Sequence, residues 1–424
     1  MKASETLFLV FVGFKTFETF FHLALNALNA SHLRRAQTMP AFCASFLNAE
    51  AYEKSKQYTA SKIHFSSFTG AWDTAVLLVF LFSGGFHFLE TLCSGWVNSE
   101  MFQGVLFCFA ILFGKQILDF PFALYHTFVL EKKFGFNKTT PGLYLRDLAL
   151  KWILTLALGT PLICFLIWAL TRLGPHWWVY GFLGMTGFQL FLLFVYPHWI
   201  SPLFNRFKPL EPGPLKEGIW SIAKKIGFDL SEIFVMDGSK RSTHSNAYFT
   251  GFGKFRRIVL FDTLVQSLST AELLGVLAHE MGHNQLKHIQ KTLLISTAMT
   301  GIGFYAWSLL IAWKPLYLAF GLSGAHVFPA LVLFPLLMDP VGLLLTPIFN
   351  KMSRKHEFEA DRFSAETTQT PESLKQALLK LSRDNLSNLH PHPLYSFFHY
   401  SHPPLSERLA ALDAVINPDF SSPQ

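Results

Sequence analysis

Cysteine and charged residues are scarce in this chain of 424 residues, and each scarcity narrows what the protein can be. The four cysteines are scattered without a Cys-x-x-Cys pair, at Cys43, Cys93, Cys108 and Cys164. This spacing argues against a disulfide framework and against a zinc site built from cysteines. Asp, Glu, Lys and Arg make up only 15% of the residues, which is too few for an ordinary soluble enzyme.

Hydrophobic residues take the place of charge, at 51% of the chain, and the mean hydropathy is +0.31. A membrane-spanning helix needs about 20 apolar residues. Charge-poor runs of this length predict seven spans, near residues 5–26, 74–93, 102–126, 152–171, 177–197, 292–312 and 327–349. We therefore expect a mainly α, polytopic protein embedded in a lipid bilayer. The first run lacks a small-residue cleavage site, so we interpret it as a span and not as a signal peptide.

The distribution of Lys and Arg predicts how the spans are oriented. Cations follow the first, third and fifth predicted spans, whereas the intervening loops 95–101 and 172–176 are nearly free of them. By the positive-inside rule, the N-terminus is outside and every odd span ends in the cytosol. These loops account for the net charge of +7, and no basic patch interleaved with aromatic residues argues for a nucleic-acid partner.

Ionisable residues also occur inside the predicted spans, where charge is costly unless it is paired or hydrated. The set comprises Lys15, Glu18, His22, His87, Glu90, Lys115, Asp119 and Asp339. Lys115 and Asp119 stand four residues apart on one helix face and can neutralise one another. Spread over four spans, the set suggests a polar, hydrated interior, which a transporter would share.

The most informative stretch of the chain is His279-Glu280-Met281-Gly282-His283. On a helix, the two histidines lie on one face and can bind a single Zn²⁺, while Glu280 reaches the attacking water instead of the metal. Such a pattern also arises by chance, but an apolar-periodic run from Thr270 onward predicts the required helix. We expect this helix to continue straight into the sixth span.

The segment before this helix predicts a small β-sheet. Apolar or β-branched runs occur at residues 233–236, 247–252 and 258–261, separated by turns at 237–239 and 253–254. An edge strand could pair with an extended peptide substrate, and the likeliest substrate-binding residues are Asn246, Ala247, Tyr248 and Phe249. A simple core hairpin explains the pattern equally well.

A peptidase zinc site needs a third protein ligand and an open fourth position. Residues 353–361 have no helix breaker and place Glu357 and Asp361 one turn apart on one face, whereas Glu359 points away. Acidic clusters on helices are more often solvated faces. Because a zinc helix occurs in the same compartment, we favour Glu357 as the third ligand and Asp361 as a carboxylate that holds a ligand histidine.

Together these motifs resemble the type I CAAX prenyl endopeptidases, integral-membrane zinc metalloproteases of the type that processes a-factor and prelamin A. The resemblance rests on residues 279–283, 353–361 and 245–248, with Ser401-His402-Pro403-Pro404 and Glu407-Arg408-Leu409. It extends to residues 128–140 and 202–211, in the order of the family and across nearly the whole chain.

The resemblance implies a seven-span α-barrel around a hydrated chamber, with a small α+β gluzincin-like protease domain. It implies one catalytic Zn²⁺ held by His279, His283 and Glu357, with Glu280 as general base. It places His402 near the scissile carbonyl, where we nominate it as the oxyanion donor, and Arg408 in the active-site network. Without the resemblance, His402 would be interpreted as a turn residue.

Four domains follow from these expectations. Residues 1–197 form a membrane region with five spans, and 198–291 form a cytosolic protease segment with the sheet and the zinc helix. Residues 292–349 form two further spans, and 350–424 form a cytosolic segment that completes the zinc site. His244, His288 and His356 lie near the motifs, but their spacing gives none of them a ligand role, so we expect them at the surface or behind the ligands.

Three functions remain in competition at this stage. The favoured one is cleavage after a prenylated cysteine, and the second is quality-control proteolysis of the HtpX kind. The third is a transporter or scaffold with a vestigial zinc site, which the intact motif residues oppose. The partner is a peptide or protein substrate that prenylation would mark, and the oligomeric state is not predicted. The C-terminal residues 421–424 lack a lysine-based retrieval signal, which favours a bacterial inner membrane over the endoplasmic reticulum of a eukaryote.

Overall fold

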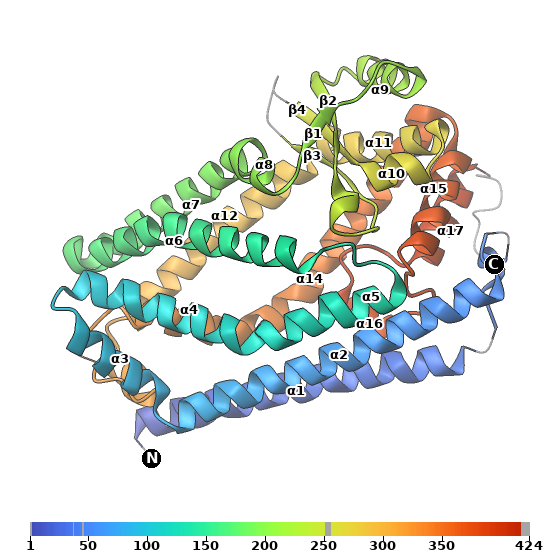
Figure 1. Cartoon of the computed structure of the whole chain (residues 1–424). Coiled ribbons are helices and arrows are strands. Elements are labelled where there is room, and N and C mark those ends of the chain that lie inside the picture. The colour runs from blue at the N-terminus through green and yellow to red at the C-terminus, as the bar shows by residue number, and fades with distance from the viewer. Residues whose placement is uncertain (1, 37, 45, 251–255, 325, 417–424) are drawn as a thin grey trace.

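Long helices dominate the structure, a computed structural model that describes residues 2–416 except 37, 45, 251–255 and 325. Within this part of the chain, seven helices are long and apolar enough to cross a membrane, as the sequence predicts. They contain α1 (Ala3–Arg35), α2 (Ala49–Phe82), α4 (Glu100–Tyr125), α6 (Pro141–Arg172), α7 (Trp177–Val195), α12 (His288–Leu310) and α14 (Ala330–Thr368). The spans lie alongside one another and form an elongated body (Figure 1).

Two of the spans continue past a π-helical turn, in which the helix widens by one residue per turn. The continuation of α4 consists of η2 (His126–Glu131) and α5 (Lys132–Phe134), and that of α7 consists of η4 (Tyr196–Ile200) and α8 (Ser201–Phe204). Short helices fill the connections elsewhere: η1 (Ala41–Cys43), α3 (Gly85–Trp96), η3 (Gly174–His176), η5 (Gly238–Lys240), α13 (Lys314–Ala319) and α16 (Pro393–His399).

The predicted second span, 74–93, is wrong in its position. Helix α2 ends at Phe82 and α3 begins at Gly85, because Gly84 adopts a left-handed conformation with φ 74° that ends the helix. The candidate span is Ala49–Phe82. Hydropathy missed it because the first half of α2 is polar, whereas apolar residues flank the break on both sides.

The helix of the His279 motif, α11 (Thr270–Gln285), does not run straight into the sixth span. Lys287 has φ 58°, so the chain turns there before α12 begins at His288. The proposed domain boundaries 291/292 and 349/350 fall inside α12 and α14. The four predicted domains therefore follow the expected limits of the bilayer and not the ends of the helices.

A four-stranded sheet lies at one end of the bundle, with the strand order β1-β2-β4-β3. Its strands are β1 (Phe207–Pro209), β2 (Leu230–Met236), β3 (Ala247–Thr250) and β4 (Arg256–Phe261). β2 and β4 are parallel, whereas β1 and β3 pair antiparallel at the edges. The three expected strands are present, although residues 251–252 and the 253–254 turn lie outside the described residues. The short strand β1 was not expected.

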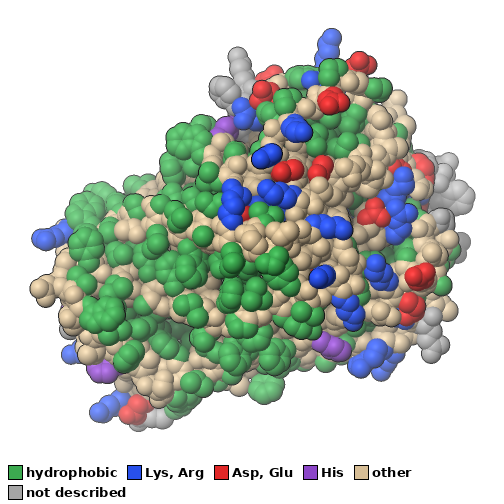
Figure 2. Space-filling model, in the orientation of Figure 1, with side chains coloured by type: hydrophobic (Ala, Val, Ile, Leu, Met, Phe, Trp, Pro, Cys, Tyr) green, Lys and Arg blue, Asp and Glu red, His purple; other side chains and the backbone are tan. Residues whose placement is uncertain are grey.

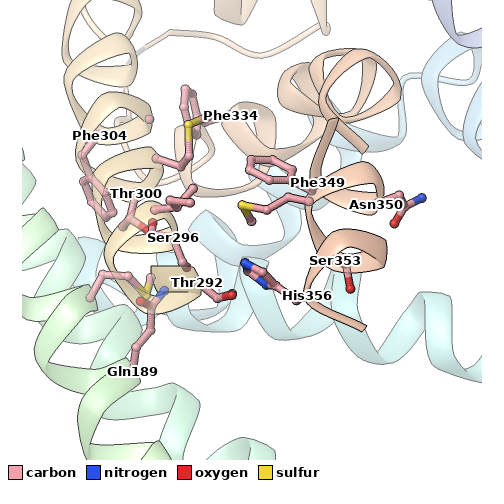
Figure 3. A pocket seen from close by; sticks show the side chains of 15 residues that line it. Gln189, Thr292, Ser296, Thr300, Phe304, Phe334, Phe349, Asn350, Ser353 and His356 are labelled. Carbon is pink, nitrogen blue, oxygen red and sulfur yellow. The ribbon is translucent and has the colours of Figure 1, made fainter. Parts of the chain in front are cut away.

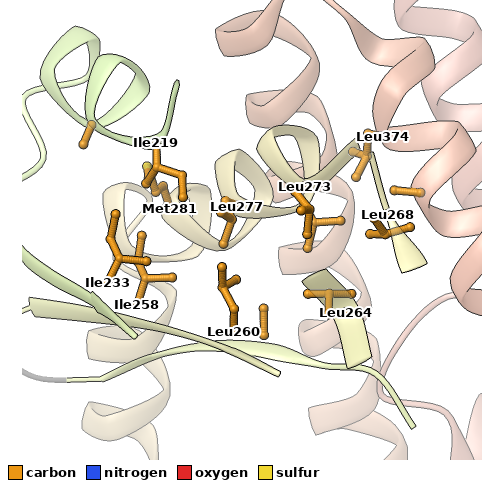
Figure 4. Packing of buried hydrophobic residues seen from close by; sticks show 14 of the residues in the cluster. Ile219, Ile233, Ile258, Leu260, Leu264, Leu268, Leu273, Leu277, Met281 and Leu374 are labelled. Carbon is orange, nitrogen blue, oxygen red and sulfur yellow. The ribbon is translucent and has the colours of Figure 1, made fainter. Parts of the chain in front are cut away.

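Helix α11 packs against this sheet and forms what we call the sheet core (Figure 4). Leu277 and Met281 are fully buried there, beside Ile258 and Leu260 of β4. The remaining helices of this end are α9 (Pro214–Lys225), α10 (Asp262–Ser267), α15 (Pro371–Asp384) and α17 (Leu405–Ile416). A capping box of Ser269 and Glu272 fixes where α11 starts.

A second cluster, the distal core, lies at the opposite end of the spans. It is rich in aromatic residues from the ends of the spans and from α3 and α13: Phe11, Phe86, Phe107, Trp177, Phe304, Trp307, Tyr317, Phe320 and Phe328. Between the two cores, hydrophobic side chains cover the visible face of the spans, while Lys and Arg gather towards the sheet (Figure 2). This surface matches a multi-pass membrane protein.

Candidate active site

Helices α11 and α14 cross at the sheet end and bring together two histidines and one glutamate. His279 Nε2 lies 3.2 Å from His283 Nε2, and the Glu357 carboxylate lies 3.3 Å from His283 Nε2 and 3.6 Å from His279 Nε2. Three ligands of a tetrahedral metal at about 2.0–2.1 Å would stand roughly 3.3 Å apart. The donor set and its spacing therefore fit a divalent metal such as zinc.

The close approach of the two helices depends on small residues. A Cβ atom on Gly275 would lie 3.1 Å from the backbone nitrogen of Leu374, and one on Gly282 would lie 3.0 Å from the ring of Phe363. The Gly275 carbonyl also accepts a hydrogen bond from the Ser364 hydroxyl at 2.7 Å. These contacts fix α11 against α14 and α15.

Asp361 and Arg408 support the first histidine. Asp361 Oδ1 lies 2.8 Å from His279 Nδ1, and Arg408 donates two hydrogen bonds to the same carboxylate, at 2.8 Å and 2.6 Å. The side chains of Asp361 and Arg408 are only 2% and 12% exposed, so the pairing is needed to keep both charges buried. Arg408 thus acts through Asp361 and lies 3.6 Å from Glu357.

Glu280 and His402 are the two remaining site residues that the sequence predicts near the histidines and Glu357. Burial raises the pKa of the Glu280 carboxyl above its usual range. His402 Nδ1 lies 2.9 Å from Glu357 Oε2, and this hydrogen bond raises the pKa of His402. Because the His402 side chain is 66% exposed, it faces open space and not the protein interior.

The predicted substrate-binding segment lies on β3, which is an edge strand. β3 pairs with β4 on one side only, through Ala247 opposite Leu260 and Tyr248 opposite Val259. It also packs against α11, the helix of the metal group. Asn246 stands at the start of the strand, where its carbonyl accepts a hydrogen bond from the Phe261 N–H at 3.0 Å.

The loop of residues 134–140 holds the chain just before β3. Phe136 stacks on His244 with ring centroids 4.0 Å apart, and its carbonyl accepts a hydrogen bond from the Thr243 N–H at 3.1 Å. His244 also contacts Glu131, while Arg241 forms a two-pronged ion pair with Asp147. The membrane region thereby positions the edge strand.

Two cavities include residues that are next to Glu357 in the chain or in contact with it. One, of about 730 Å³, lies between α7, α12 and α14 and is lined by apolar residues such as Phe304 and Phe349, together with His356 and other polar side chains (Figure 3). The other, of about 720 Å³, is more polar and contains His402, Arg408, Lys62 and His244. The first cavity is lined by His356, which precedes Glu357 in the chain. The second is lined by His402, which contacts Glu357.

Sequence reasoning missed several residues of this region. Glu131, Arg241, Asp147 and Asn385 form the network around the strand, and no spacing rule connects positions so far apart. His288 was expected at the surface or behind the ligands, and its side chain is only 4% exposed. A separation of five residues does not place two side chains on one helix face, so helix periodicity could not predict the contact of His283 with His288 across the turn at Lys287.

Residues 29–206 match a family model described as "CAAX prenyl protease N-terminal, five membrane helices", and residues 209–416 match the model of peptidase family M48. Two similar curated proteins are the CAAX prenyl protease 1 homologues of Oryza sativa, at 38% identity over 89% of this chain and 90% of the relative, and of Homo sapiens, at 34% over 89% of both.

The yeast protein named CAAX prenyl protease 1, from Saccharomyces cerevisiae, is 36% identical over 87% of both chains. Among solved structures, the crystal structure of Ste24p from S. mikatae superposes with a TM-score of 0.91 at 33% identity. It covers 96% of this chain and 99% of that one. Similarity at this coverage extends to the fold of the whole chain.

Proposed function

The chain belongs to peptidase family M48 and is a membrane metalloendopeptidase of the CAAX prenyl protease type, and from this premise we propose its substrate and the roles of its residues. We propose that it hydrolyses peptide bonds in C-terminal peptides that carry a prenylated cysteine, using one zinc ion. The observation that carries the proposal is the convergence of His279, His283 and Glu357 beside Glu280.

The metal centre is proposed to contain a single Zn²⁺ held by His279, His283 and Glu357. Imidazole nitrogens with one carboxylate are a donor set that zinc peptidases use, with the fourth position left open. Zinc bound there would polarise the scissile carbonyl and lower the pKa of water. Asp361 accepts the Nδ1 proton of His279 and so directs Nε2 of that ring to the metal.

Glu280 is proposed as the general base and acid. Its carboxylate takes the proton of the attacking water and returns it to the leaving amine. His402 is proposed to donate a hydrogen bond to the carbonyl oxygen as negative charge develops on it. Its position against Glu357 and its exposure to the polar cavity support this role. Arg408 is proposed to position Asp361 and thereby His279.

The substrate is proposed to bind as an added strand on β3, through residues 246–249. The free edge of β3 offers unpaired backbone groups for an extended peptide. The apolar cavity bounded by α7, α12 and α14 is suited to an isoprenoid chain, because a ligand site of this kind occupies about 300–1,000 Å³ and is mainly apolar. The polar cavity around His402 would then receive the peptide beyond the cleaved bond.

The active site is proposed to face the cytosol, on the side to which Lys and Arg of the loops point. The membrane is the bacterial inner membrane or, in a eukaryote, the endoplasmic reticulum. The relatives described above all come from eukaryotes, which gives weight to the second location. The two alternative functions, HtpX-like quality control and a transporter or scaffold, receive no support from these relatives.

The decisive experiment is cleavage of a farnesylated C-terminal peptide by the purified chain in detergent, with and without a zinc chelator, and with zinc content measured in parallel. We expect chelator-sensitive cleavage that is lost in His279→Ala together with the metal. The same peptide without its farnesyl group is the matched control. Equal cleavage of both peptides would refute the prenyl preference but not the peptidase activity. Undiminished zinc in His279→Ala would refute the ligand set.

A further inference from the structure

A second cluster of polar side chains stands directly behind the metal group. His288, the first residue of α12, points between α11 and α14 and is almost fully buried. Its Nδ1 lies 3.0 Å from Nδ1 of His283, and its Nε2 lies 2.9 Å from Glu359 Oε2. Glu359 stands two residues after Glu357 on α14, so it points away from the metal and towards His288.

The positions of the protons in this chain of contacts follow from the metal ligand. His283 presents Nε2 to His279 and Glu357, so Nε2 is the atom that would bind the metal. A neutral imidazole that binds metal through one nitrogen carries its proton on the other. Nδ1 of His283 therefore donates a hydrogen bond to Nδ1 of His288, which must be unprotonated. The proton of His288 then resides on Nε2 and is donated to Glu359.

We propose that His288, held by Glu359, is the positioning residue of the second zinc ligand, His283. This inference rests on the proposed metal site. The two ligand histidines would then be supported differently. His279 contacts a carboxylate directly, whereas His283 reaches the carboxylate of Glu359 only through the neutral ring of His288. Such outer partners fix the tautomer and the ring orientation of a ligand.

A second metal ion is the competing explanation for the same residues. Ligand atoms of His288, His356 and Glu359 lie within 4.8 Å of one another. The proton positions argue against it, because Nε2 of His288 carries the proton given to Glu359 and Nδ1 accepts the proton of His283. His356 also stacks on His288, with an interplanar angle of 9° and centroids 4.0 Å apart. The nitrogen lone pairs lie in the planes of the rings. Because the two planes are nearly parallel and separate, the lone pairs of His288 and His356 do not point at one common ion.

The test is a set of single variants of the full chain, purified in detergent and titrated for Zn²⁺ affinity against a competing chelator. Loss of an outer partner typically weakens metal binding 10- to 100-fold. We expect His288→Ala and Glu359→Ala to fall within this range. Glu359→Gln should restore nearly normal affinity, because its amide oxygen still accepts the proton of His288. His356→Phe should change nothing, because it preserves the ring stack.

The matched control is Glu366→Ala, which removes an exposed carboxylate from the same helix α14, where it pairs only with Arg362 in the described structure. Cobalt substitution adds a spectroscopic readout, since the visible absorption of Co²⁺ should shift in His288→Ala but not in Glu366→Ala. Unchanged affinity in Glu359→Ala would overturn the proposal. Two zinc ions per chain, reduced to one in His356→Phe, would establish the second metal site instead. A wild-type chain without zinc would refute the proposed function itself.

Discussion

The two ends of the molecule are packed as protein interiors, whereas the middle of the bundle is not. The sheet core and the distal core contain residues with no exposed surface, such as Leu277 and Phe107. In between, no residue of α1 from 12 to 24 and no residue of α14 from 334 to 346 is buried. The middle of these two helices therefore lacks the dense packing of the two ends.

The ion pair of Asp361 and Arg408 at the sheet end differs in burial from the cluster around Lys115 in the middle. At the sheet end, Asp361 and Arg408 are deeply buried and fully paired. In the middle, Lys115 contacts Asp73 and Asp119, and all three side chains are between 41% and 49% exposed. Exposed ion pairs contribute little to stability, whereas a buried charge that loses its partner is costly. We therefore expect the loss of a partner to destabilise the protein more at the buried Asp361 and Arg408 pair than at the exposed Lys115 cluster.

The largest predicted effect is on the rate of peptide cleavage and comes from Glu280, which we propose as the general base and acid. Glu280→Gln removes the proton acceptor and should lower the rate of peptide cleavage by about 10²- to 10⁴-fold. Zinc content and the thermal unfolding temperature should remain those of the wild type. Glu366→Gln serves as the control. Cleavage at the normal rate in Glu280→Gln would remove Glu280 from the mechanism.

The next largest effect is a loss of stability, and it should differ between two glycines of α4, one in the distal core and one in the middle of the bundle. A Cβ atom on Gly104 would lie 2.5 Å from Ile167 Cδ1 and 2.7 Å from Phe328 Cβ, whereas one on Gly114 would meet nothing within 4 Å. Gly104→Val should therefore destabilise the protein by about 1–3 kcal/mol through overpacking. Gly114→Val makes the same change in helix propensity without the clash. Similar unfolding temperatures for the two variants would contradict the packing difference.

A third prediction concerns acid stability at the sheet end. Burial alone would raise the pKa of Glu272, but hydrogen bonds from Lys380 and from Ser269 outweigh it and hold that pKa below its usual 4.5. The stabilisation is thus fully present above pH 4.5 and is lost as the pH falls through the lower folded value. Glu272→Gln should cost about 1–2 kcal/mol at neutral pH. Its unfolding temperature should also vary less than that of the wild type between pH 5 and about 3.

The smallest effect should come from the exposed ion pairs in the middle. Lys115→Met removes the partner of Asp73 and Asp119, yet water can solvate both carboxylates. We expect a loss of stability below about 1 kcal/mol. Lys115→Arg keeps the charge and is the control. A loss of several kcal/mol in Lys115→Met alone would mean that this region is dry.

The sequence was most informative where a short pattern carries the geometry. His279, Glu280 and His283 share one helix, so their arrangement follows from helix periodicity, and the carboxylates of Glu357 and Asp361 follow from a second one. The span count followed from composition. The break at Gly84 did not, because apolar residues surround it on both sides. The contact of His288 with His283 depends on the left-handed turn at Lys287, which no periodicity describes.

Helix α14 spans 39 residues without interruption, from Ala330 in the distal core to Thr368, and its residue Ala365 belongs to the sheet core. At 1.5 Å per residue it is about 58 Å long, and Pro347 lies about 15 Å before Glu357 along its axis. A small change in the direction of the helix at Pro347 is therefore magnified at Glu357. A bend of about 4° at Pro347, which lacks an N–H to brace the turn, would swing Glu357 by about 1 Å. Because displacements of this size at a reacting centre can cost about a hundredfold in rate, a change in the angle of α14 at Pro347 would be expected to slow hydrolysis through the position of Glu357.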